Sequence, residues 1–184
     1  MSHDRFGRLL EHTDPLGNTT RFVRDETGNV RESRRAVLRH FGTDDGVALG
    51  KRLLREAVEH EDATDFELAL VACATFGAFD ESLLPLFIEQ SYADWHHKHE
   101  DVVSTLGKYK SPETVDALYH ATQWIPEYLD YDEARALAHK AIWALGGTPG
   151  PEATAALTRL LTDKDEDLHE AAAKQLRRRG EPVA

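Results

Sequence analysis

"LGKYKSPETVDALYHA", residues 106–121, and "LGGTPGPEATAALTRL", residues 145–160, are two copies of one pattern. An offset of 39 residues aligns six identical pairs. The pairs are Leu106 and Leu145, Gly107 and Gly146, Pro112 and Pro151, Glu113 and Glu152, Ala117 and Ala156, and Leu118 and Leu157. Self-similarity at a fixed period is typical of repeat architectures, so the pattern predicts a unit that recurs along the chain.

Two looser copies precede them, "HFGTDDGVALGKRLL" at residues 40–54 and "TFGAFDESLLPLFI" at residues 75–88. In all four copies a large apolar residue, at position 41, 76, 106 or 145, is followed by glycine. A glycine in the left-handed conformation commonly ends a helix. We therefore expect a helix to end at each apolar residue, the glycine to close it, and a short turn to lead into a second helix.

The start of each second helix has its own signals. Proline is favoured in the first turn of a helix, which makes Ser111 and Gly150 the expected caps before Pro112 and Pro151. Asp44 and Asp80 are the expected caps in the looser copies. Apolar residues then recur at helical spacing, so each unit is a helical hairpin whose apolar stripe only a neighbouring hairpin can cover. The sequence predicts an all-α protein built as an α-solenoid.

This unit resembles HEAT-type repeats, and residues 145–176 resemble the short bacterial form most closely. The resemblance extends over about residues 31–180. It implies a solenoid of four to five helical hairpins in residues 31–184, with residues 1–30 as a separate segment. HEAT-type solenoids mainly hold other proteins on an extended surface, although a fold alone does not fix a function.

Residues 1–30 follow a different pattern. Three D-x-x-G tetrapeptides occupy residues 4–7, 14–17 and 25–28, and the runs between them include Leu9-Leu10 and residues 19–23. Asp at the first position and Gly at the fourth favour a type I turn, so the segment is predicted to join short strands through turns, as in a β-hairpin.

The segment "HDRFGRLLEHTDPLGNTTRFVRDETGNV", residues 3–30, resembles the YD repeats of Rhs-type polymorphic toxins. His3, Phe22 and Arg24 stand where those repeats prefer tyrosine. Three interpretations stay open: a piece of a toxin gene joined to this reading frame, a hairpin that caps the first solenoid repeat, or a chance match. The first implies an immunity protein, because Rhs-type toxins are encoded beside small cytoplasmic proteins that bind and block their toxic domain.

Charge is distributed unevenly along the chain. Residues 1–40 carry a net charge of +2 and the total is −11, which leaves −13 on residues 41–184. Such a field repels nucleic acid and anionic membranes and attracts basic proteins, although it also serves solubility alone. We therefore expect a basic protein partner, with a cognate toxin domain as its first candidate, and neither nucleic acid nor membrane.

Several features favour a cytoplasmic protein. No stretch is long and apolar enough for a membrane span, and no signal peptide is recognisable at the N-terminus. Cys73 is the only cysteine, which excludes an internal disulfide, and its apolar surroundings predict a small buried side chain.

Two stretches combine aromatic rings with charge, "YADWHHKHED" at residues 92–101 and "QWIPEYLDYDEA" at residues 123–134. Pro126 prevents a continuous helix in the second, so we expect a loop that interrupts the hairpin rhythm. Aromatics beside carboxylates are typical of a binding surface for a basic partner, although the same residues could pin the loop to the core. The predicted partner-binding residues are Asp94, Trp95, His96, Glu127, Tyr128, Asp130, Tyr131, Asp132 and Glu133.

An enzymatic alternative uses the histidines. If residues 92–101 were helical, His96 and His99 would share a face near Glu100, and imidazole with carboxylate suits iron or zinc. HEAT-type deoxyhypusine hydroxylases, which these repeats also resemble, hold two irons with four His-Glu pairs. This chain has three such pairs, at residues 60–61, 99–100 and 169–170. No phosphate-binding, nucleophile or zinc-protease motif is present, so we predict no catalytic residue, no cofactor and no metal. Besides the immunity protein and the metal-dependent enzyme, a further interpretation of the chain is a general scaffold that binds no toxin.

Overall fold

The computed structural model describes residues 2–3, 9–13, 19–21, 31–131 and 135–183. By backbone contacts the chain divides into two compact units, one of Met1–Leu54 with Ala69–Ala78 and one of Arg55–Leu68 with Phe79–Ala184. Among the described residues, no helix is long and apolar enough to cross a membrane.

The first unit begins with three short strands, β1 (Ser2–His3), β2 (Leu9–Thr13) and β3 (Thr19–Arg21). They pair antiparallel in the order β1-β2-β3, with Glu11 opposite Arg21 and Thr13 opposite Thr19. This confirms the predicted strands. The three D-x-x-G tetrapeptides lie outside the described residues.

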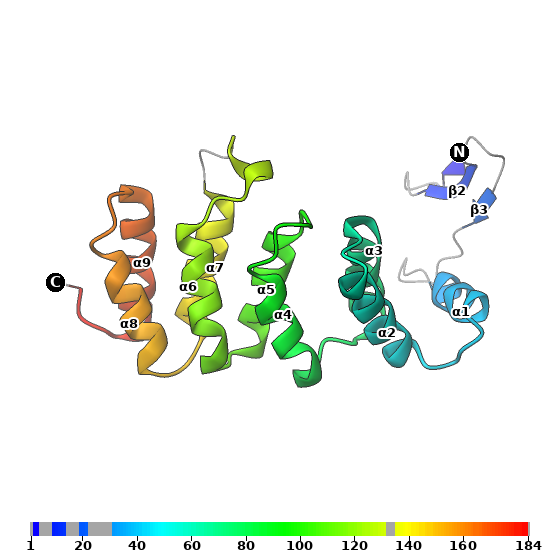
Figure 1. The fold of residues 1–184 in the computed structure, drawn as a ribbon, viewed down its shortest axis with the longest axis horizontal. Helices are drawn as coiled ribbons and strands as arrows, with labels where there is room; N and C mark the ends of the chain where they lie inside the picture. The colour runs from blue at the N-terminus through cyan, green and yellow to red at the C-terminus, as the bar shows by residue number, and fades with distance from the viewer. Residues whose placement is uncertain (1, 4–8, 14–18, 22–30, 132–134, 184) are drawn as a thin grey trace. The chain divides into compact units, whose positions relative to one another are not determined.

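After the strands the chain forms successive helices, and the predicted all-α solenoid is confirmed (Figure 1). The α-helices are α1 (Arg31–His40), α2 (Gly46–Glu59), α3 (Ala63–Phe76), α4 (Leu84–Gln90), α5 (His99–Tyr109), α6 (Val115–Gln123), α7 (Ala136–Gly147), α8 (Pro151–Leu160) and α9 (Glu166–Arg179). Three short 3-10 turns, η1 (Glu81–Leu83), η2 (Pro112–Thr114) and η3 (Glu127–Leu129), precede α4, α6 and α7.

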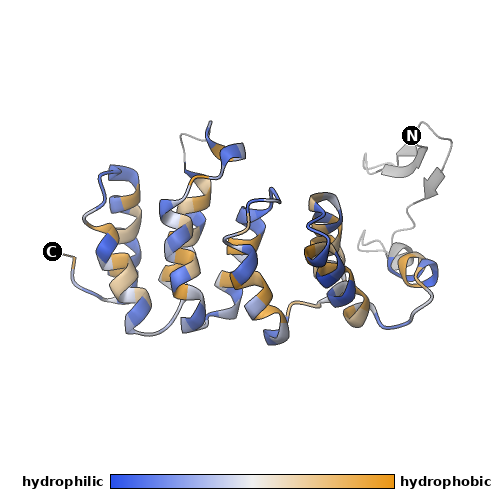
Figure 2. Cartoon of the chain, viewed as in Figure 1, coloured by the Kyte–Doolittle hydropathy of each residue, from blue (hydrophilic) through white to orange (hydrophobic). Residues whose placement is uncertain are grey.

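In the second unit, α4–α5, α6–α7 and α8–α9 are helical hairpins whose second helices stack, α5 on α7 and α7 on α9 (Figure 1). The aligned leucines are all buried, Leu106 and Leu145 at 0% exposure and Leu118 and Leu157 likewise. Each helix carries both apolar and hydrophilic residues along its length (Figure 2). The repeat therefore gives each helix apolar residues to bury, and their burial against neighbouring helices stabilises the stack.

The predicted caps are largely confirmed. The side chains of Ser111 and Asp80 accept hydrogen bonds from the backbone N–H groups of Glu113 and Ser82, and Gly150 precedes α8. The prediction of Asp44 is wrong by one residue. Asp45 accepts the N–H of Ala48, and Thr43 holds Asp45 through a second hydrogen bond.

Glycine serves two purposes in the repeat. Gly42 and Gly77 have φ of +63° and +70°, as predicted for glycines that close a helix. The same prediction is wrong for Gly107 and Gly146, which lie inside α5 and α7. Helix α5 instead ends at Tyr109, and the next residue, Lys110, takes the left-handed conformation.

Gly107 and Gly146 allow close approach of neighbouring second helices. A Cβ atom on Gly107 would lie 2.8 Å from the Cβ of Ala144 on α7. One on Gly146 would lie 2.3 Å from Oε1 of Gln175 on α9. Since real Cβ atoms do not approach one another so closely, Gly107 sets the spacing of α5 and α7, whereas a Cβ on Gly146 would require the side chain of Gln175 to move.

Gly107→Ala should therefore lower the free energy of unfolding by about 1–2 kcal/mol, because overpacking outweighs the gain in helix propensity. Urea denaturation followed by far-UV circular dichroism measures the change. Gly147→Ala is the matched control, since a Cβ there meets no atom within 4 Å. Equal stability of the two variants would contradict the packing role of Gly107.

The basic end of α9 closes the α7–α8 connection. Arg179 donates hydrogen bonds to the backbone carbonyls of Leu145, Gly146, Thr148 and Gly150. It thereby satisfies the last carbonyls of α7, which have no partner within their own helix. The structure gives this arginine a specific structural role, beyond the general preference for positive charge at the end of a helix.

Candidate functional site

The connections within the three hairpins of the second unit lie at one edge of the helical layers (Figure 1). Among the described residues they comprise 91–98, 124–131 with 135, and 161–165, and hydrophilic residues predominate in them (Figure 2). We call this set of loops the loop edge.

The second and third of these loops are joined by side chains. Gln123 Nε2 donates to Asp163 Oδ2 at 3.1 Å, and Arg135 forms an ion pair with Asp165 at 3.3 Å. Arg135 also donates to the carbonyl of Thr122 at 2.9 Å, which ties the end of the long loop back to α6. The long loop therefore begins and ends at anchored positions.

The first loop, residues 91–98, does not have the helical structure considered for residues 92–101. Residues 92–98 are not helical, because α4 ends at Gln90 and α5 begins only at His99. The His96 ring satisfies this loop: its Nε2 lies 3.0 Å from the carbonyl of Gln90, and its Nδ1 accepts the N–H of Lys98 at 3.1 Å. His96 and His99 are thus not on one helical face, although the loop still brings them together.

Aromatic rings form a continuous column through the loop edge. His96 stacks on Phe66 of α3 at 4.5 Å between ring centroids, and on His99 at 4.3 Å. Trp124 meets the His99 ring edge-on at 4.7 Å. Phe66, His96 and His99 are at most 1% exposed. This column, Phe66–His96–His99–Trp124, joins α3 to the loops of the two following hairpins.

Tyr128 connects the long loop to the start of α5. Its hydroxyl accepts the N–H of His99 at 3.3 Å and donates to His99 Nδ1 at 3.0 Å, while His99 Nε2 donates to the carbonyl of Ala93 at 2.6 Å. Lys98 precedes α5 and forms no side-chain cap, so the tyrosine hydroxyl takes that role from a distance in sequence.

Burial keeps these imidazoles neutral, and it outweighs the hydrogen bonds to the carbonyls of Gln90 and Ala93, which act to raise the pKa. Burial is the main cause that lowers the pKa of His96, from the ordinary 6.5 to about 4, and the neighbouring His99 lowers it further. Burial also lowers the pKa of His99 and of His120. A neutral imidazole can donate from one nitrogen and accept at the other, as His96 and His99 both do here.

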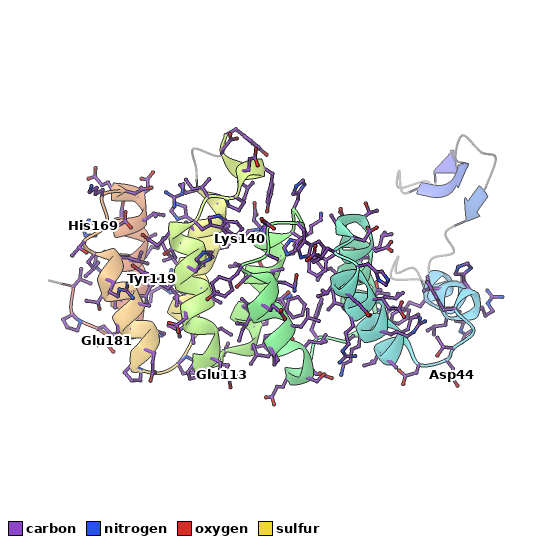
Figure 3. All side chains as sticks on the ribbon, viewed as in Figure 1. Asp44, Glu113, Tyr119, Lys140, His169 and Glu181 are labelled. Carbon is purple, nitrogen blue, oxygen red and sulfur yellow. The ribbon has the colours of Figure 1, made fainter. Side chains whose placement is uncertain are left out.

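His96, His99 and Glu100 have few ligand atoms available for a metal ion. Both ring nitrogens of His96 and of His99 have protein partners, and Glu100 forms an ion pair with Lys140 of α7, which Figure 3 labels. Within the described ranges, no group of three or more His, Cys, Asp or Glu side chains could hold a metal ion. The arrangement instead fixes two loops relative to each other.

The predicted partner-binding residues fall into three groups. Asp94, Glu127, Asp130 and Tyr131 are exposed, Tyr131 at 77%, and the rings of Trp95 and Tyr128 are half-buried. Asp132 and Glu133 lie outside the described residues. His96 is 0% exposed, so its side chain belongs to the column and not to the surface.

A pocket of about 380 Å³ opens between the first two loops. Its lining residues are Asp94, His97, His99, Trp124, Pro126, Glu127 and Tyr128. His97, which sequence reasoning did not single out, stacks on Tyr128 at 4.6 Å. No local pattern in the sequence marks this contact, because the two residues belong to different hairpins.

Family models match both ends of the chain. Residues 122–184, from the end of α6 to the C-terminus, match a model described as HEAT repeats. Residues 3–36, which include β2, β3 and the start of α1, match a model described as RHS Repeat. No curated protein and no solved structure is significantly similar to the chain. The chain therefore joins an RHS-like segment to a HEAT-like helical scaffold of a kind suited to protein binding.

Proposed function

We propose that this chain is a non-enzymatic immunity protein that binds a cognate Rhs-type toxin domain through its loop edge. The observation that carries the proposal is the combination of an RHS-repeat match at residues 3–36 with an acidic helical repeat. The RHS match supports the toxin context, and the HEAT-like solenoid supports a protein as the ligand.

The exposed side chains of the loop edge support a basic partner. Asp94, Glu127 and Asp130 present carboxylates on two adjacent loops, and Tyr131 adds a large exposed ring. Tyrosine supplies much contact area at low entropic cost, and carboxylates steer a basic protein toward it. Many toxin domains act on nucleic acid and are basic, so this surface complements them.

The test uses the full chain and the polypeptide encoded immediately upstream of its gene, whose C-terminal domain is the candidate toxin domain. We expect the two to co-purify as a stoichiometric complex, and cells that express the toxin domain to grow only when the chain is present. Metal content is read on the same purified sample. Absence of both a complex and protection, or metal-dependent turnover by the chain alone, would overturn the proposal.

Tyr131→Ala should weaken the complex at least tenfold, because the ring supplies contact area. The melting temperature should stay unchanged, because the ring is 77% exposed.

Asp130→Lys should mainly slow association and reduce its dependence on salt. Surface plasmon resonance at two ionic strengths separates the two effects. Phe41→Ala is the control, since Phe41 is also an exposed aromatic residue, at 41%, and lies in the turn after α1, outside the loop edge. Equal affinity of all these variants would contradict the assigned surface.

A further inference from the structure

We infer that the pocket between residues 94–99 and residues 124–128 binds a single lysine or arginine side chain of the partner. This inference rests on the proposed function for the identity of the partner, and goes beyond it by assigning the recognised group. The pocket is open to solvent and has room for one long side chain rather than for a large cofactor.

The pocket contains two carboxylates, those of Asp94 and Glu127. Neither Asp94 nor Glu127 forms an ion pair with any residue that the structure describes. The two lysines of neighbouring elements are engaged elsewhere, Lys98 with Glu67 at 2.6 Å and Lys140 with Glu100. A cation that enters the pocket therefore meets two uncompensated carboxylates and displaces no internal lysine.

The rest of the wall suits the stem and head of such a side chain. Trp124, Pro126 and Tyr128 supply apolar and aromatic surface, against which the methylene groups of lysine or arginine pack. A guanidinium or ammonium group also binds favourably near tryptophan and tyrosine rings. A ligand with the same length but no charge would make the apolar contacts and lose the electrostatic ones.

The electrostatic environment of Tyr128 agrees with this geometry. Burial is the main cause that raises the pKa of its hydroxyl, and the negative charges of Glu100 and Asp101 raise it further. Two further carboxylates, those of Glu100 and Asp101, thus act on Tyr128 from the start of α5, although Lys140 pairs with the first of them.

The pocket is held in place before any ligand arrives. Tyr128 is bound to His99 through two hydrogen bonds, and His99 in turn stacks in the buried column. Pro126 is buried at the base of the long loop. Because little ordering remains to be done on binding, a weak cationic contact adds to affinity instead of being lost to entropy.

The test titrates the full chain with N-acetyl-arginine methylamide, N-acetyl-lysine methylamide and the neutral N-acetyl-citrulline methylamide at pH 7.5. The indole N–H of Trp124 is followed by NMR. We expect saturable shifts with Kd on the order of millimolar for one or both of the cationic compounds. Citrulline should bind at least tenfold more weakly. Equal binding of all three, or no shift at all, would overturn the inference.

Two double variants localise the effect. Asp94→Asn with Glu127→Gln should weaken cation binding at least tenfold. Glu89→Gln with Glu170→Gln makes the same change in net charge on exposed helix positions outside the pocket, and should leave binding within twofold. If both double variants bind alike, a general field effect replaces the pocket.

The two proposals fail in distinguishable ways. Cation binding in the free chain is measured without a toxin, so it stands even if no complex forms. If instead the toxin domain binds the Asp94→Asn, Glu127→Gln variant as tightly as the wild type, the immunity function stands and the assignment of the pocket is wrong.

Discussion

Replacing Phe66 with alanine is expected to lower the free energy of unfolding of the second unit by about 3–5 kcal/mol, the usual range for a large aromatic residue in a core. Phe66 is 0% exposed, stacks on His96 at 4.5 Å and meets Trp95 edge-on at 5.2 Å. Its removal leaves a cavity at one end of the aromatic column, beside a loop whose backbone is held by hydrogen bonds to the His96 ring. We therefore expect residues 91–98 to lose their fixed conformation first.

Urea denaturation followed by tryptophan fluorescence measures this loss, since Trp95 reports directly on the altered contact. Two variants serve as controls. Phe66→Leu keeps most of the apolar volume and should cost less than half as much. Phe41→Ala removes the same side chain from a position that is 41% exposed and should change stability by no more than about 0.5 kcal/mol. A loss below about 1 kcal/mol for Phe66→Ala would show that the column does not support the loop edge.

The same experiment links the fold to the proposed function. If the column holds the loops, Phe66→Ala should weaken partner binding although Phe66 touches no solvent. Tyr131→Ala should weaken binding without loss of stability. The comparison separates residues that position the surface from residues that form it.

The helical part of the fold was predictable because its signals are local. The spacing of Leu106, Leu118, Leu145 and Leu157 indicates buried helix faces without knowledge of any neighbour, and all four are fully buried. The caps at Asp80 and Ser111 depend on side chains within two residues of the groups they bind. The strands of the N-terminal segment follow from runs of β-forming residues between turns.

The predictions that were wrong share one cause: contacts with other parts of the chain determine the structure at these residues. Gly107 looked like a helix end, but Ala144 of the next hairpin explains it. The spacing of His96 and His99 suggested one face of a helix. The His96 ring instead stacks on Phe66 and forms hydrogen bonds with the backbone of its own loop. Tyr128 caps a helix that begins 29 residues before it. Spacing along one segment contains no information about such contacts.

The buried histidines lead to a pH dependence. Lowering the pH from 7 to 4 should reduce the free energy of unfolding by roughly 3 kcal/mol through His96 alone, since one pKa unit corresponds to about 1.4 kcal/mol. The sign follows from the direction of the shift. The pKa of His96 is about 4 in the folded protein and near 6.5 in the unfolded chain, so between these values only the unfolded chain binds the proton. His96 thus contributes stability above pH 6.5 that is lost as the pH falls toward 4.

The comparison that isolates this effect is His96→Gln, which keeps a donor for the carbonyl of Gln90 but does not titrate. This variant should be less stable than the wild type at pH 7, because the ring stack is lost, and should lose less stability between pH 7 and 4.5. His169→Gln removes an exposed histidine on α9, labelled in Figure 3, and should leave the wild-type slope unchanged. Parallel pH profiles for the wild type and His96→Gln would contradict a neutral, buried His96. A steeper wild-type profile would instead mean that acid weakens the loop edge itself, and partner binding should then decline over the same pH range as the stability of the column.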